Sequence, residues 1–371
     1  MSSLLLNNKP LLLNMLSLRS LSLSTLLLVG AVACKKEKEV PAETALVYTT
    51  VSTLAGNGAD GFTDGSAAVA QFYGPEGATM DAQGNVYVAD NGNYSIRKIT
   101  PSGTVSTLAG NGTDGFVNGL LADARFSGPV DVALDRQENL YVADYGNNCL
   151  RKITPAGVVS TLAGTGVAGF ADGGAATAQF NGPNGLVVDG QGVIYVSDYN
   201  NSRIRKVTPN GTVSTVAGTG QRGFADGPSS SAQFSGPEGL AIDGRGTLYV
   251  AEFAGHRIRK IAPNGMVSTL AGTGVRGYAD GAGSTAQFYG VSGLALDAHG
   301  DLLVADAGNY CVRKVTPAGV VSTVAGTGTT GFADGPVGTA QFNALSGITI
   351  GAKGSVYVTE YGERIRKITS K

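Results

Sequence analysis

The chain has 371 residues, 15% of them charged, and its formal net charge is −1. This balance argues against nucleic-acid binding, because a nucleic-acid groove needs a concentrated basic surface to displace the counterions of phosphates. Glycine makes up 56 residues, about twice its average share. Such enrichment is typical of many short strands joined by tight turns, since glycine accepts the positive φ angles that turns need.

The first 33 residues are predicted to form a secretory signal peptide. They contain Lys9 and Arg19, followed by an apolar run over residues 20–33 that is too short to span a bilayer core of about 30 Å. Translation from Met15 instead of Met1 would give a signal of more conventional length, and the sequence leaves both starts open.

Small residues lie directly before Cys34 and resemble the lipobox of bacterial lipoproteins, with Ala31 where leucine is usual. The resemblance implies that Cys34 is lipidated, and two acyl chains suffice for stable anchoring. Residues 34–46 then form a charged, flexible tether. Because Lys35 follows the cysteine, resemblance to Gram-negative lipoproteins implies a place in the cell envelope, at the outer membrane. An ordinary signal peptide followed by a chance cysteine is the alternative.

A hexapeptide, VSTLAG or VSTVAG, occurs six times at a constant spacing (105 − 51 = 54 residues). Its copies begin at Val51, Val105, Val159, Val213, Val267 and Val321. A constant period of this length is the signature of a repeat architecture. The repeats extend over residues 47–371, which we therefore expect to form one closed domain.

Each repeat contains four short segments that read as strands. In the copy over residues 77–110 they lie at 77–81, 85–90, 95–100 and 104–110. All four are rich in β-branched or aromatic residues and are bounded by turn residues. Four strands in an up-and-down meander describe a propeller blade. The sequence therefore predicts an all-β, six-bladed β-propeller of four-stranded antiparallel blades.

Two segments show which repeat this is: GPEGATMDAQGNVYVADNGNYSIRKI (74–99) and GPNGLVVDGQGVIYVSDYNNSRIRKV (182–207). They resemble the NHL repeat, and the resemblance covers all six copies. The family includes RNA binders, sensor ectodomains and lyases, so the resemblance implies the fold rather than one activity.

The phase of the repeats predicts how the ring closes. The chain begins with a VSTLAG strand and ends at residues 364–368 with none after it. The outermost strand of the last blade must then come from residues 47–54, which hides the edges that an open array would expose.

Several recurring residues are predicted to be structural. Cys149 and Cys311 lie three repeats apart, on opposite sides of a six-bladed ring, so we expect free thiols. The AQF motif, first at residues 70–72, supplies one aromatic peg between blades. An acid and an arginine recur in every repeat, as a predicted cross-strand contact: Asp90, Asp144, Asp198, Glu252, Asp306 and Glu360 with Arg97, Arg151, Arg205, Arg259, Arg313 and Arg366.

Function should lie where the repeats differ. In this meander the outer-to-inner connections and the loops between second and third strands share one face of the ring, here called the top face. The position after the recurring proline differs in each repeat and should face the channel mouth there: Glu76, Val130, Asn184, Glu238, Ser292 and Ser346. Asp131 replaces the usual glycine of the next position. The predicted ligand-binding residues are Glu76, Asp131, Asn184 and Glu238, with Tyr73 and Tyr289 just before such positions.

These residues predict a secreted, lipid-anchored propeller that acts without catalysis as a binding module for a small ligand, glycan or protein. The alternative is a calcium-dependent hydrolase or lyase at the same mouth, resembling the six-bladed lactonases, because carboxylate and amide oxygens suit Ca²⁺. A solvated polar mouth without a ligand is the plainest interpretation. His256 and His299 are the only histidines, too few for a zinc cluster, and neither the GxGxxGF runs nor the serines indicate a catalytic or dinucleotide site.

Overall fold

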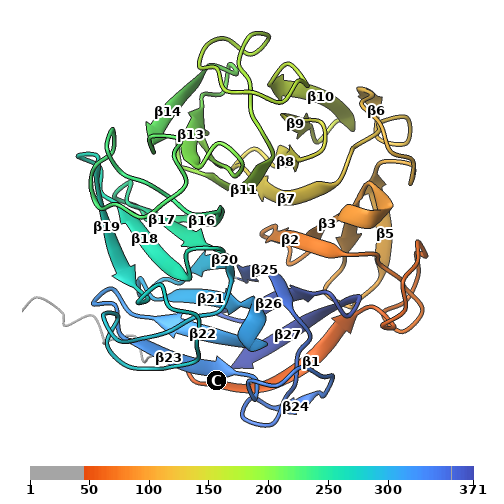
Figure 1. Ribbon diagram of the computed structural model, residues 1–371. Helices are drawn as coiled ribbons and strands as arrows, with labels where there is room; N and C mark the ends of the chain where they lie inside the picture. Colours follow the sequence, from red (N-terminus) through yellow and green to blue (C-terminus); the bar gives the residue numbers. More distant parts are fainter. Residues whose placement is uncertain (1–45, 352) are drawn as a thin grey trace, which may run out of the picture. The chain divides into compact units, whose positions relative to one another are not determined.

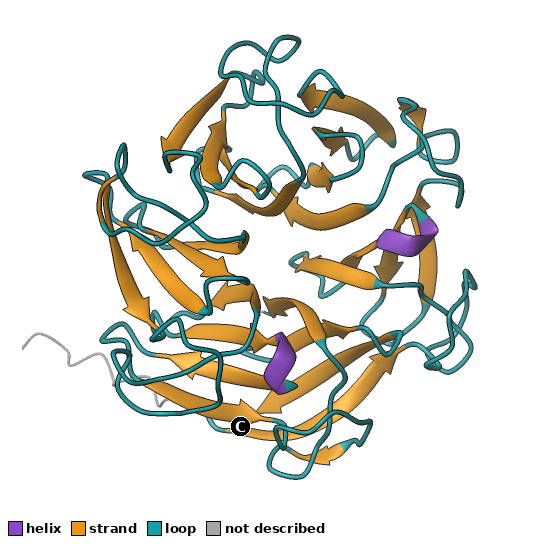
Figure 2. Cartoon of the chain, in the orientation of Figure 1, coloured by secondary structure: helices purple, strands orange, loops and turns teal. Residues whose placement is uncertain are grey.

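The computed structural model describes residues 46–351 and 353–371, and these form six antiparallel sheets in a ring around a central channel (Figure 1). The predicted signal peptide, Cys34 and all but the last residue of the predicted tether lie outside the described residues. The six-bladed propeller is thus confirmed. Figure 2 shows that strands and loops dominate, with two short 3₁₀ turns, η1 (Asn91–Asn93) and η2 (Ala307–Asn309), among the described residues.

Each blade runs from an innermost strand beside the channel to an outermost strand. Blades 1 to 3 are β2 (Pro75–Met80), β3 (Val86–Asp90), β4 (Ser95–Ile99) and β5 (Val105–Ala109); β7 (Pro129–Leu134), β8 (Leu140–Asp144), β9 (Cys149–Ile153) and β10 (Val158–Ala163); and β11 (Pro183–Val188), β12 (Ile194–Asp198), β13 (Arg203–Val207) and β14 (Val213–Ala217). Blades 4 to 6 are β16 (Pro237–Ile242), β17 (Leu248–Glu252), β18 (Arg257–Ile261) and β19 (Met266–Ala271); β20 (Val291–Leu296), β21 (Leu302–Asp306), β22 (Cys311–Val315) and β23 (Val321–Ala325); and β25 (Leu345–Ile350), β26 (Val356–Glu360), β27 (Arg364–Ser370) and β1 (Tyr48–Ala55).

Three sheets differ from the predicted four-stranded blade because they contain a fifth, two-residue strand. These strands are β6 (Gly119–Leu120), β15 (Gly227–Pro228) and β24 (Gly335–Pro336), and each pairs with the outermost strand of its sheet. In the other three blades a single bridged residue pair, such as Gly65 with Val105, joins the connection to the outermost strand. The long outer-to-inner connection thus covers the edge strand of the blade that it leads into, which protects that edge from pairing with another chain.

Closure by the N-terminal strand is confirmed. β1 pairs antiparallel with β27, with Val51 opposite Ile368 and Thr53 opposite Arg366. Figure 1 shows β1, in orange, beside the blue strands of the last blade. Blade 6 is therefore built from both ends of the described chain, and this pairing closes the ring.

The core lies between adjacent blades. The phenylalanine of each AQF or ARF motif is fully buried, as predicted for a peg: Phe72, Phe126, Phe180, Phe234, Phe288 and Phe342. Phe72, for example, packs with Ala55 and Ile365 of blade 6 and with Val88 of blade 1. Cys149 and Cys311 are buried free thiols, as expected.

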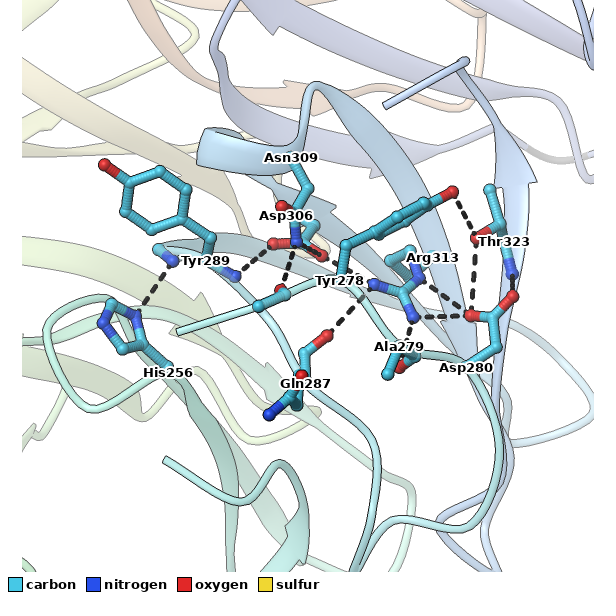
Figure 3. Close-up of polar contacts among 12 residues, drawn as sticks. His256, Tyr278, Ala279, Asp280, Gln287, Tyr289, Asp306, Asn309, Arg313 and Thr323 are labelled. Atoms are coloured by element: carbon cyan, nitrogen blue, oxygen red, sulfur yellow. Dashed lines mark hydrogen bonds and ion pairs between the residues drawn. The ribbon is translucent and has the colours of Figure 1, made fainter. Parts of the chain in front are cut away.

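The recurring acid and arginine form the predicted contact, and it is structural. Figure 3 shows the blade 5 copy, where Arg313 Nη1 lies 2.8 Å from Asp306 Oδ2 and both side chains are fully buried. The Arg313 guanidinium also donates to the Ala279 and Gln287 carbonyls and to Asp280. Because these acceptors belong to the long connection, the arginine fixes that connection against its blade.

No helix among the described residues is long and apolar enough to cross a membrane.

Candidate functional site

The central channel contains a cavity of about 310 Å³. The innermost strands of all six blades line it. The lining includes Glu76, Asn184, Glu238, Ser292 and Ser346, which share the repeat position that differs between blades, and Asp131, which lies one position later in its own blade. The structure therefore brings together the four polar residues that the sequence predicted at the channel mouth.

A wider vestibule lies above this cavity and shares Glu76, Asn184 and Glu238 with it. Tyrosines from the top-face loops complete its wall: Tyr94, Tyr145, Tyr199 and Tyr361. Asp114 also lines the vestibule and is exposed. Among the described residues that line the cavity and the vestibule there is no lysine, arginine or histidine. The mouth is thus lined by acidic and aromatic side chains, and the positive charge of Arg222 acts on the pKa of Tyr199 from outside this lining.

The Glu76 carboxyl group accepts hydrogen bonds from neighbouring side chains. The Tyr361 hydroxyl donates to Glu76 Oε1 at 3.1 Å. Burial raises the pKa of Glu76 to about 7, although hydrogen bonds from Tyr361 and Ser346 oppose the rise. Burial has this effect because a carboxylate loses its hydration inside the channel wall and no cation replaces it.

Glu238 lies three blades away, on the opposite side of the ring, and its carboxyl is less well satisfied. Burial and then the charge of Glu76 raise the pKa of Glu238 well above its ordinary value, and no hydrogen bond from a described residue opposes this rise. The negative charge of Glu76 therefore disfavours ionisation of Glu238 across the mouth.

Asp131 has a structural task. Its Oδ1 accepts a hydrogen bond from the Val132 amide at 2.8 Å, and its Oδ2 accepts one from the Leu186 amide at 2.7 Å, in the neighbouring blade. Burial raises the pKa of Asp131 to about 7. In the other five blades this position is glycine, and a Cβ on Gly185, for example, would overlap the Glu238 carbonyl. Asp131 thus joins blades 2 and 3 while it lines the cavity.

Tyr73 and Tyr289 do not reach the mouth. Tyr73 is half exposed, and its backbone amide donates to Asp90 Oδ1 at 2.8 Å. The Arg276 guanidinium carbon lies 3.6 Å from the centroid of the Tyr289 ring. The same ring is edge-on to His256, and Figure 3 shows these two side chains. Neither tyrosine lines the cavity or the vestibule. The structure therefore separates these two predicted ligand-binding residues from the other four.

Sequence reasoning missed the tyrosines that do line the vestibule. Three of them stand directly after the recurring acid, at a position that reads Asn91, Tyr145, Tyr199, Phe253, Ala307 and Tyr361 along the chain. This position differs between blades as strongly as the one after the proline. Comparing it across the six copies would have identified Tyr145, Tyr199 and Tyr361.

The mouth does not offer a prepared metal site. Within residues 46–351 and 353–371 there is no group of three or more histidine, cysteine, aspartate or glutamate side chains placed to hold an ion. Both oxygens of Asp131 already accept backbone hydrogen bonds. A calcium ion takes about six to eight oxygen ligands, so Glu76 and Glu238 would need many waters to complete the shell.

Comparison with known proteins agrees with the repeat assignment. The NHL repeat family model matches residues 72–99, 126–153 and 180–207. The chain is 30% identical over 281 residues to the Arabidopsis thaliana protein SUPPRESSOR OF QUENCHING 1, chloroplastic; the match covers 71% of this chain and 27% of that protein. The chain also matches teneurins, such as mouse teneurin-3, over 8% of their length. The chain thus spans about a quarter or less of the curated relatives that it matches.

Solved structures share the architecture. An auxiliary nutrient binding protein from Bacteroides thetaiotaomicron superimposes with a TM-score of 0.67 at 18% identity, covering 87% of this chain and 76% of that one. A gluconolactonase from Xanthomonas campestris superimposes with a TM-score of 0.56 at 17% identity, covering 87% and 90%. At these identities the likeness shows the fold alone, which hosts both binding and hydrolytic proteins.

Proposed function

We propose that this six-bladed propeller, built from NHL repeats, is a non-catalytic binding module that takes a small ligand at the top-face mouth of its central channel. One observation carries the proposal: the side chains that break the repeat converge on a cavity of about 310 Å³. Cavities of a few hundred Å³ with a few convergent polar groups are typical of small-molecule sites. The Bacteroides nutrient binding protein of the same fold is consistent with this function.

A calcium-dependent hydrolase or lyase at the same mouth is the weaker alternative. The gluconolactonase shares the architecture, but a shared fold does not carry an activity. The engaged oxygens of Asp131 and the missing third free carboxylate are a poor match to a calcium shell.

Blocking the mouth tests the binding function. The purified protein is screened by thermal shift against monosaccharides, amino acids, simple amines, carboxylates and calcium chloride. A ligand that binds only the folded state stabilises it by about 2.7 kcal/mol at a hundredfold excess over Kd. We expect Asn184→Trp, which fills the mouth, to abolish the shift, and Val167→Trp, at a position that is 61% exposed, to preserve it.

Two results would contradict the binding function. One is that no compound class stabilises the wild-type protein. The other is that Asn184→Trp responds as the wild type does. A shift with calcium alone, reversed by EDTA, would favour the metal-dependent alternative.

The second part of the proposal is secretion and anchoring through Cys34, which rests on the residues before the cysteine. We expect the wild-type protein in the membrane fraction of a Gram-negative host, and the Cys34→Ser variant in the soluble periplasmic fraction. Membrane association that persists in Cys34→Ser would contradict a lipid anchor.

A further inference from the structure

The channel mouth has an approximate two-fold symmetry that the six-fold repeat does not require. Glu76 and Glu238 are three repeats apart (238 − 76 = 162 residues), and the same spacing relates Tyr361 to Tyr199 and Thr359 to Ser197. Each glutamate therefore stands opposite an equivalent glutamate, each with a tyrosine and a hydroxyl side chain from the preceding blade. We call these sets the Glu76 arm (Glu76, Thr359 and Tyr361) and the Glu238 arm (Glu238, Ser197 and Tyr199).

The hydroxyl side chains hold the backbone of the two glutamates. Ser197 Oγ accepts a hydrogen bond from the Gly185 amide at 2.7 Å and donates to the Glu238 carbonyl at 2.6 Å. Thr359 Oγ1 accepts one from the Gly347 amide at 2.7 Å and donates to the Glu76 carbonyl. Both side chains are fully buried.

The other four blades have alanine at the position of these hydroxyls: Ala89, Ala143, Ala251 and Ala305. At this repeat position a hydroxyl thus occurs only where the next blade presents a glutamate to the mouth. The junction of blades 5 and 6 has an inter-blade hydroxyl bond of another kind, from Ser292 Oγ to the Leu345 carbonyl. The coincidence at the Ser197 position does not follow from building a propeller, since four blades have alanine there. The hydroxyls therefore indicate that the backbone is held in place specifically at the two glutamates.

The tyrosines complete the arms. The Tyr361 hydroxyl donates to Glu76 Oε1 at 3.1 Å. Tyr199 lines the vestibule together with Glu238, and the charge of Glu238 adds to burial in raising the pKa of the Tyr199 hydroxyl. Tyr145 lines the same wall, so aromatic rings surround the two carboxyls.

The charges define what can bind between the arms. Two facing carboxylates enclosed by the channel wall, with no basic residue lining the hollow, are unfavourable without a positive partner. An ammonium group has three N–H donors and no acceptor, which matches carboxylate and tyrosine oxygens, and aromatic faces attract cations. Calcium would need more oxygen ligands than the arms supply.

We propose that the Glu76 and Glu238 arms clamp one primary ammonium group, of a free amine or of a lysine side chain, at the channel mouth. This inference rests on the proposed function, and it names the ligand class of the same site. Glu76 and Glu238 accept the N–H hydrogen bonds, Tyr199 and Tyr361 surround the cation, and Ser197 and Thr359 are positioning residues.

The clamp requires ionised carboxylates, so its affinity depends on pH in a defined direction. Burial raises the pKa of Glu76 to about 7, and burial and then the charge of Glu76 raise the pKa of Glu238. Asp131 titrates in the same cavity, since burial and then the charge of Glu76 raise its pKa to about 7 against two backbone hydrogen bonds. Bound ammonium favours the ionised form and so expels a proton. Affinity should therefore rise from pH 6 to pH 8, and binding near neutral pH should release protons.

Calorimetric titration of the purified protein tests the clamp, with n-butylamine and Nα-acetyl-lysine amide as probes and glucose and calcium chloride for comparison. We expect Glu76→Gln and Glu238→Gln each to weaken ammonium binding at least about tenfold. Asp114→Asn removes the same charge from an exposed position of the vestibule and should change the affinity less than about twofold. Titration in two buffers of different ionisation enthalpy measures the released protons.

The two probes distinguish the source of the ammonium group, since binding of n-butylamine indicates a free amine and binding of the lysine amide alone indicates a side chain. Thermal unfolding of each glutamine variant shows that it still folds. The clamp is overturned if neither amine binds, or if Asp114→Asn weakens binding as much as the glutamine variants. If glucose or another neutral compound binds and Asn184→Trp abolishes that binding, the proposed function stands and the clamp falls.

Discussion

The molecule has a set of fully buried acids within the blades and a set of partly exposed acids at the channel mouth, and the two sets differ in what lies opposite them. In each blade the recurring acid faces an arginine, as Asp198 faces Arg205 with a separation of 2.6 Å between Oδ2 and Nη1. At the channel mouth Glu76 and Glu238 face each other instead, with no basic residue lining the hollow among those described. The first set occurs six times and has its counter-charge within the fold. The second set has two members, Glu76 and Glu238, and has no counter-charge among the described residues that line the hollow.

This contrast separates architecture from function. A contact that recurs in every blade cannot mark one site on the ring, and the arginine network fixes the long connections in all six copies. An unpaired pair of carboxyls lowers stability, so its presence needs another reason. The proposed ligand binding at the mouth would supply that reason.

Opening the ring should have the largest effect, because both sets of acids depend on closed blade junctions. Deleting residues 47–56 removes β1, including Thr53, whose amide donates to Asp334 in the last blade. We expect loss of the cooperative unfolding transition of the whole domain, measured by calorimetry, because each blade buries its core against its neighbours. A deletion variant that unfolds at the wild-type temperature would contradict closure.

Breaking the arginine network of one blade should have the second-largest effect on stability. Arg205→Met leaves Asp198 buried without its counter-charge and removes hydrogen bonds to the Ala171 and Gln179 carbonyls. We expect a loss of about 3–5 kcal/mol in the free energy of unfolding, measured by denaturant titration. Arg203→Met, on the same strand but only partly buried, is the matched control and should cost about 1 kcal/mol or less. Equal losses in both variants would remove the distinction.

The pH dependence should sharpen the contrast at the mouth. The folded-state pKa of Glu76 is about 7, above the ordinary value of 4.5. Between these values the folded protein holds a proton that the unfolded chain has lost, so this carboxyl lowers stability as the pH rises from about 5 to 8. We expect the double variant Glu76→Gln/Glu238→Gln to recover about 1–2 kcal/mol at pH 8 relative to wild type, and to gain little at pH 5.

Denaturant titrations at the two pH values measure this difference. Asp114→Asn, which removes an exposed acid of the same vestibule, should leave the wild-type pH dependence in place. A double variant that is less stable than wild type at pH 8 would show that the two glutamates have favourable partners in the folded protein. The distinction between paired acids in the blades and unpaired acids at the mouth would then be wrong.

The smallest expected effect is that of Ser197→Ala, which restores the residue found in four other blades. It removes the hydrogen bonds to the Gly185 amide and the Glu238 carbonyl, and should cost about 1 kcal/mol. The same variant should weaken ammonium binding about two- to fivefold, because Glu238 is no longer held in place. A stability change with unaltered affinity would show that Ser197 only joins the blades.

The sequence predicted the ring well because the period of a repeat carries topology as well as strand positions. The four segments of residues 77–110 match β2 to β5 within two residues, and the missing last VSTLAG identified β1 as the closing strand. The fifth strands, such as β15 (Gly227–Pro228), could not be predicted. A two-residue strand that contains proline has no alternating pattern, and its pairing depends on where the arginine network draws the connection.

The site was predicted in part for a related reason. Glu76, Asn184 and Glu238 were found because they replace one another at a single repeat position. Tyr73 lies outside the lining of the cavity and the vestibule, because it directly follows the buried Phe72 and successive side chains of extended backbone point to opposite sides. Directions within an irregular connection depend on tertiary contacts that the sequence pattern does not show.

The pairing of β1 with β27 also sets an order in time. β1 is synthesised before the other strands of the ring, but it finds its partner only when β27 has followed, because Tyr48 pairs with Ser370. Until then, β1 and the edge of blade 6 are exposed strands that can pair with other chains. A chain that ends before β27 therefore keeps the edge of β1 exposed, and this edge is covered only when β27 pairs with it.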